Sequence, residues 1–132
     1  MSIQVITSSQ LITTSFVKLG TKVIRTSGYD KAVLYLEYDP AENAAVLQIY
    51  FKTGPNAALL SQTTRKESTD GASTVFKEIF SYTENLGNAN DDYIQIPLQL
   101  ADDVLEVWVT ETSTAKGTIN IAEISLFNTG KQ

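Results

Sequence analysis

The sequence predicts an all-β domain built as an antiparallel β-sandwich, and three observations lead to this fold class. Threonine, valine and isoleucine dominate the periodic segments, and these residues favour strands. Apolar and polar residues alternate over short runs that turn-forming residues separate at regular spacing. No stretch of about 11 residues keeps a helical apolar stripe, so essentially no helix is expected. The 132 residues suit a single domain, residues 1–132, of about eight strands.

The first quarter of the chain predicts short strands at residues 3–7, 15–19 and 22–25. Residues 1–10 are expected to form an N-terminal arm.

Alternation is clearest in residues 32–38 and 45–52, where every second residue is apolar and shares one face of a strand. Residues 39–43 lie between the two segments and contain Asp, Pro and Asn, which favour a turn. The two segments are therefore expected to pair as a hairpin.

A longer hairpin is expected at residues 59–82, because Asp70 and Gly71 form a turn signal between two extended segments. Both segments are mostly polar, so this hairpin is expected to protrude from the body or to lie at an edge. Residues 93–98 predict a further strand, in which Pro97 favours an edge or strand-end position.

The last third of the chain predicts a strand at residues 104–109, a polar turn and a strand at residues 118–127. These two strands are expected to form another hairpin. In the second of them, Ile119 and Ile121 are expected on one face, opposite the face that carries Ile124.

Composition excludes most catalytic and metal-binding chemistry. The chain contains no cysteine and no histidine, so disulfides, thiolate or imidazole metal sites and the usual proton-transfer residue are absent. The doublets Asp91-Asp92 and Asp102-Asp103 are interpreted as turn residues, because neighbours on an extended chain point to opposite faces. Loop 85–92 offers oxygen ligands for calcium but lacks the spaced pattern of a calcium loop. We expect no enzyme activity, no metal and no cofactor.

Charge and hydropathy limit the partners. The net charge of −5 disfavours a nucleic-acid backbone, which needs clustered positive charge. No apolar run approaches the roughly 20 residues that cross a bilayer. Residues 1–10 contain no cationic segment that leads into an apolar core, so no secretory signal is expected. The chain is therefore expected to be made in a cytoplasm and to bind neither nucleic acid nor membrane.

Several predicted strands carry apolar residues on both faces, although a strand of a sandwich buries only one. The second face carries Val33 and Tyr35 in one strand, Val46 and Tyr50 in another, and Val104 and Trp108 in a third. Exposed apolar patches on soluble proteins commonly mark association surfaces, so oligomerisation or docking is favoured over scattered surface apolar residues.

The order of these patterns resembles small structural proteins of tailed bacteriophages. A T-S-F-x-x-L-G strand at residues 14–20 precedes a G-Y-D-x-x-V-L strand at residues 28–34, and a Y-I-Q-I-P strand follows at residues 93–97. In this respect the chain is similar to jelly-roll head decoration, or cement, proteins. The resemblance implies a jelly-roll sandwich without catalytic residues, which assembles as a trimer on the capsid exterior of the virion and clamps subunits of the major capsid protein.

This resemblance and the two-faced strands together predict a non-enzymatic virion structural protein. The contacts within the homo-oligomer are expected around Val33, Tyr35 and Tyr50, and the capsid is expected to meet the arm at Ile3 and Val5 or the hairpin that begins at Leu59 and Leu60.

The alternative hypothesis is a carbohydrate-binding module or a phage tail adhesin, in which exposed Tyr29 and Tyr93 stack against sugar rings. Trp108 lies within an apolar strand, where packing in the core or an interface is the simpler interpretation.

Overall fold

The structure is a computed structural model that describes residues 1–15, 17–40, 46–60, 77–83, 92–100, 102–111 and 117–130. These ranges contain ten strands and one helix of four residues. In chain order the elements are β1 (Ser2–Gln4), β2 (Gln10–Leu11), β3 (Val17–Lys18), β4 (Ile24–Arg25), β5 (Lys31–Asp39), β6 (Val46–Gly54), α1 (Ala57–Leu60), β7 (Lys77–Thr83), β8 (Asp92–Gln99), β9 (Val104–Glu111) and β10 (Thr118–Phe127).

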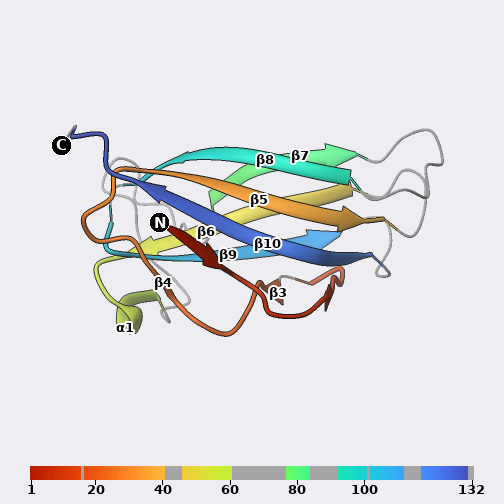
Figure 1. The fold of residues 1–132 in the computed structure, drawn as a ribbon. Helices are drawn as coiled ribbons and strands as arrows, with labels where there is room; N and C mark the ends of the chain where they lie inside the picture. Colours follow the sequence, from red (N-terminus) through yellow and green to blue (C-terminus); the bar gives the residue numbers. More distant parts are fainter. Residues whose placement is uncertain are drawn as a thin grey trace.

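The strands form two antiparallel sheets that lie one over the other (Figure 1). Sheet A has the order β1-β10-β5-β8, with β2 also paired to β10. Sheet B has the order β3-β9-β6-β7, with β4 also paired to β9. From β4 to β10 the chain changes sheet at every connection except the one between β6 and β7. This winding is that of a double-sheet jelly roll, and the predicted all-β sandwich is confirmed.

The core lies between the two sheets and follows the predicted alternation. In β5 every second residue from Ala32 to Tyr38 is buried, and Leu47 and Ile49 are fully buried in β6. In β10 the residue Ile124 is also fully buried. Each large aliphatic side chain buried in this way contributes roughly 1.5–3 kcal/mol relative to exposure, so the inner faces supply the main stabilisation.

Both predicted short hairpins are wrong. β5 pairs with β10 and β8 in sheet A, whereas β6 pairs with β9 and β7 in sheet B. In the same way β9 belongs to sheet B and β10 to sheet A. Alternation and a turn signal indicate strands and a reversal, but they do not specify the sheet in which the next strand pairs. Because both edges of β5 are occupied, the following strand crosses to the other sheet.

The segment expected as a long hairpin takes a different course where the structure describes it. Leu59 and Leu60 belong to α1, which lies against β6 and β9. Residues 77–83 form β7 at one edge of sheet B, paired with β6. Residues 61–76, which include the expected turn at Asp70 and Gly71, lie outside the described residues, so a protruding hairpin tip stays a prediction.

The amino-terminal segment is part of sheet A. β1 pairs with β10 through Ser2↔Ser125, Ile3↔Ile124 and Gln4↔Glu123, so the residues expected as an arm lie along the edge of the sandwich in this chain. None of the described helical residues forms a segment long and apolar enough to cross a membrane.

Candidate association surface

The outward-facing side of β5, β8 and β10, which we call face A, carries an apolar patch. Tyr93 is 79% exposed, Ile121 47%, Phe127 45% and Tyr35 38%. The outer face of a sheet in a sandwich is ordinarily polar, because water covers it. Four large exposed side chains on three neighbouring strands therefore indicate a surface suited to association.

One half of face A is centred on Glu37. Strand register places Tyr93 beside Glu37 on one side and Ile121 beside it on the other. Tyr35 lies two residues away on the same face. These residues line a shallow hollow of about 180 Å³. The arrangement places one carboxylate, which already accepts a hydrogen bond from Asn120, within an apolar rim.

A β-bulge at Asn120 lies beside this half of the face and turns Ile119 into the core. The register of β10 on β5 shifts between Ile119 and Ile121, so Asn120 is an extra residue. Ile119 is fully buried, whereas Ile121 is 47% exposed, and the prediction that they share a face is wrong. The Asn120 side chain accepts a hydrogen bond from the Ser9 hydroxyl (2.8 Å) and donates one to Glu37 (3.5 Å).

The other half of face A lies at the opposite end of β5. Val33 is half-buried beside Pro97 of β8, and Phe127 lies beside Lys31. These residues line a second hollow, of about 310 Å³. β8 is an edge strand of sheet A, which confirms the edge position predicted from Pro97.

The structure brings together only some of the predicted interface residues. Val33 and Tyr35 lie on face A, whereas Tyr50 lies on the outer side of sheet B, directly across from Trp108. These residues cannot contribute to one contact patch. Sequence reasoning did not include Ile121 and Phe127, although both alternate with the buried residues Ala122, Ile124 and Leu126 and therefore face outward.

The two tyrosines of the carbohydrate hypothesis are far apart. Tyr29 is half-buried against the core beside one end of β5, and Tyr93 lies at the other end, next to Glu37. The intervening six residues of β5 span about 20 Å. Tyr35 is the tyrosine that shares a hollow with Tyr93.

On the outer side of sheet B, the described side chains around Trp108 contact one another. The Trp108 indole N–H donates a hydrogen bond to Glu106 (3.1 Å), and Lys18 forms an ion pair with the same carboxylate (3.4 Å). The Lys52 ammonium lies 5.6 Å from the centre of the Trp108 ring, where a cation–π interaction operates. Val104 is only 2% exposed. The two-faced pattern of β9 therefore reflects burial and pairing within the chain.

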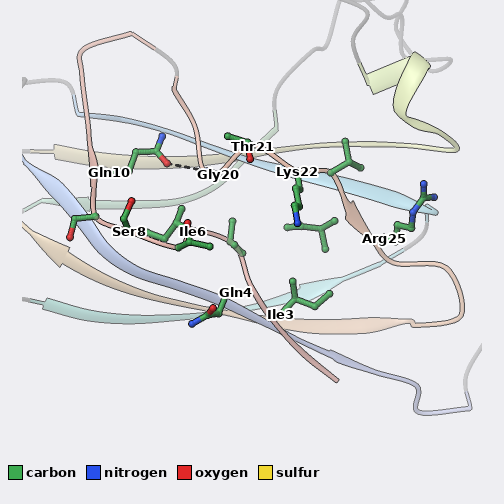
Figure 2. Close-up of a pocket in the computed structure, with 14 residues that line it drawn as sticks. Ile3, Gln4, Ile6, Ser8, Gln10, Gly20, Thr21, Lys22 and Arg25 are labelled. Carbon is green, nitrogen blue, oxygen red and sulfur yellow. Dashed lines mark hydrogen bonds between the residues drawn. The ribbon is translucent and has the colours of Figure 1, made fainter.

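A groove separates β1 from the segment at residues 20–25 (Figure 2). It has a volume of about 540 Å³, and the predicted contact residues Ile3 and Val5 line it. Its opposite wall carries Lys22 and Arg25.

The described acidic doublet, Asp102-Asp103, takes part in the fold through its backbone. The backbone oxygens of Asp102 and Asp103 accept hydrogen bonds from the hydroxyl and amide of Thr26, at 2.6 and 2.8 Å. Asp91 and residues 85–90 of the considered calcium loop lie outside the described residues. Within the described ranges, no group of three or more acidic side chains is suitably placed for a metal ion.

No protein-family model matches the chain. No curated protein matches it either. Solved structures of virus particles do match. The chain is similar to a chain of T=1 particles derived from infectious bursal virus, with a TM-score of 0.59 and 9% identity. It is also similar to chains of the T13 particle (TM-score 0.60, 9% identity) and of the VP2 subviral particle (0.58, 7%) of infectious bursal disease virus.

These matches cover 98%, 98% and 99% of this chain, but only 32%, 31% and 33% of the matched chains. The chain thus spans about a third of the length of the virus-particle proteins that it resembles. At such low identity the likeness concerns the fold. It extends along nearly the whole chain, and the sandwich described above is therefore one that proteins of virus particles also contain.

Proposed function

We propose that the chain is a non-enzymatic structural protein of a virion, which decorates the outer surface of a capsid lattice and stabilises it as a cement protein. The observation that carries this proposal is the apolar patch of face A around Tyr35, Tyr93 and Ile121. The fold likeness to proteins of virus particles supports it. The resemblance to decoration proteins of tailed phages favours the capsid exterior as its location.

The proposed partners are two further copies of the chain, in a trimer, and the major capsid protein. Val33 and Tyr35 of face A contact neighbouring copies. Ile3 and Val5, in and next to the edge strand β1, contact the lattice. The segment that begins in α1 at Leu59 and Leu60 contacts it as well. Tyr50 lies on the other sheet and is left out of this contact.

Sedimentation velocity tests the oligomer. We expect the wild-type chain to form a defined oligomer at micromolar concentration and the Tyr35→Ser/Ile121→Ser variant to be monomeric. Tyr50→Ser is the matched control, because it removes a half-buried aromatic residue from the other sheet and leaves face A intact. A monomeric wild-type chain would contradict the proposed contact.

Electron microscopy tests the lattice role. Undecorated shells assembled from the coat protein of the source virus are mixed with the purified chain and imaged. Added density at regular lattice positions is expected. Shells that stay bare at saturating chain concentration would refute decoration, whatever the oligomeric state.

A second candidate function is carbohydrate binding, as a module or in a tail adhesin. The observation that favours it is the hollow that Tyr35 and Tyr93 share, because two exposed rings can stack against a sugar. A glycan array separates the two candidates. Binding that Tyr93→Ala abolishes, and that Tyr29→Ala leaves intact, would support this hypothesis.

A further inference from the structure

The edge of β1 offers unused backbone hydrogen-bonding groups. The Leu126 amide donates to the Met1 carbonyl (2.7 Å), and the Val5 amide donates to the Ala122 carbonyl (2.8 Å). In an antiparallel pair the bonded positions alternate, so Ser2 and Gln4 direct their N–H and C=O groups away from β10. β1 has no second partner strand among the described residues. A further extended segment can therefore pair with it.

The opposite edge of sheet A is protected against such pairing. The Leu100 amide donates to the Asp30 carbonyl, so the same alternation turns the backbone of Pro97 away from β5 and toward the open side of β8. Proline has no N–H to donate, which blocks strand addition there. Neither Ser2 nor Gln4 provides such protection to β1.

The groove beside β1 is cationic, although the chain as a whole carries a net charge of −5. Lys22 and Arg25 line it, and its lining contains no aspartate or glutamate. Both basic side chains are exposed, and neither has an ion pair or side-chain hydrogen bond with any described residue. Figure 2 shows Lys22 reaching from its own wall toward the wall formed by the amino-terminal segment.

The groove is preformed. Gln10 holds its closed end, because its side chain donates to the Lys18 carbonyl (2.7 Å) and accepts from the Gly20 amide (3.0 Å) (Figure 2). Gly20 has a φ of +76°, and a Cβ there would lie 2.0 Å from the Val5 carbonyl oxygen. The absence of a side chain thus lets the two walls meet at this point.

We propose that this groove is a docking site for an extended acidic segment of a partner protein. The segment adds as a strand to the open edge of β1 through Ser2 and Gln4, and its carboxylates pair with Lys22 and Arg25. Backbone pairing supplies affinity, and the two cations select acidic sequences. The site differs from face A in position and in chemistry, and it shares Ile3 and Val5 with the proposed lattice contact.

The test uses the full chain, labelled with ¹⁵N, and a short peptide of alternating valine and glutamate. Titration is expected to shift the amide signals of Ser2 and Gln4 and to slow their hydrogen exchange. The corresponding valine–lysine peptide is the ligand control and is expected not to bind. Raising the salt concentration is expected to weaken binding, because the cations are exposed.

Two variants test the ion pairs and the backbone pairing separately. Lys22→Ser/Arg25→Ser is expected to weaken binding about 5- to 10-fold, as the loss of two exposed ion pairs implies. Lys31→Ser, outside the groove, is its control. Gln4→Pro is expected to abolish binding while the fold is kept, because it removes only an amide that faces away from β10.

Three results would overturn the proposal. One is equal binding of the valine–lysine peptide, and another is undiminished binding to a folded Gln4→Pro chain. The third is a response of Lys22 and Arg25 to inorganic phosphate without any effect of the acidic peptide on Gln4, which would identify a small-anion site. These measurements require neither an oligomer nor a capsid. Their failure would therefore not count against the proposed function, which has separate tests.

Discussion

Tyr38 donates a hydrogen bond from its hydroxyl to Oε2 of Glu111 over 2.5 Å, deep between the sheets. Tyr38 belongs to β5 in sheet A and Glu111 to β9 in sheet B, so this bond joins the two layers. Both residues are 0% exposed. The Gly117 amide donates to Oε1 of the same carboxylate (3.1 Å). A buried carboxylate needs such donors, because its transfer from water is otherwise strongly unfavourable.

Replacing Tyr38 with phenylalanine is expected to lower the free energy of unfolding by about 1.5–3 kcal/mol, the range for hydrogen bonds to charged groups. The ring keeps its packing, so the effect isolates the lost donor. Urea denaturation followed by circular dichroism measures the change. Tyr35→Phe removes an exposed hydroxyl and is expected to change stability by less than about 0.5 kcal/mol. Equal effects of the two substitutions would contradict the structural role of the Tyr38–Glu111 bond.

Alanine substitutions at two glycines with positive φ separate the energetic cost of a steric contact from that of backbone strain. Gly20 and Gly28 have φ values of +76° and +84°, so alanine is strained at either position. No atom would meet a Cβ at Gly28, whereas one at Gly20 would lie 2.0 Å from the Val5 carbonyl oxygen. Gly28→Ala is expected to cost about 1–2 kcal/mol, and Gly20→Ala about 1–3 kcal/mol more. Thermal unfolding of both variants measures this difference, and similar melting temperatures would refute the close contact.

Strands whose apolar and polar residues alternate were predictable from the sequence. The strand at residues 32–38 and the buried face of Leu34 and Leu36 follow from alternation, because one side of a sandwich strand is apolar. Strand partners were not predictable in this way. Pairing in a jelly roll joins segments far apart in the chain, as β5 with β10, and no local feature of either segment specifies the other.

The candidate surface was only partly predictable for a related reason. Val33 and Tyr35 were identified because they occupy the second face of a strand with an apolar first face. Ile121 was assigned to the same face as Ile119, since a regular strand alternates strictly. The extra residue Asn120 breaks that alternation through contacts with Ser9 and Glu37, which are distant in sequence.

The polar cluster on sheet B consists of Lys18, Glu106 and Trp108, and we expect Glu106 to contribute more to stability than Lys18. Glu106 is 8% exposed and is bonded to both Lys18 and Trp108, whereas the Lys18 side chain is 30% exposed. Glu106→Ala leaves the indole N–H without its acceptor and is expected to cost about 1–3 kcal/mol. Lys18→Ala removes only a partly exposed ion pair and is expected to cost less than about 1 kcal/mol. Urea denaturation ranks the two variants, and a larger effect of Lys18→Ala would contradict this account.

Association through face A predicts that thermal stability depends on protein concentration. Assembly that involves only folded chains stabilises them by mass action, so the melting temperature rises with total concentration. For a domain of this size the expected rise is about 3 °C for each tenfold increase.

Differential scanning calorimetry of the wild-type chain and of Tyr35→Ser/Ile121→Ser checks this dependence. The double variant is expected to melt at one temperature at all concentrations, close to the wild-type value at high dilution, because both side chains are exposed and contribute little to the fold of a single chain. A wild-type melting temperature that does not change with concentration would mean that face A is not covered by a second copy. The apolar patch would then be left to the proposed lattice contact or to the carbohydrate hypothesis.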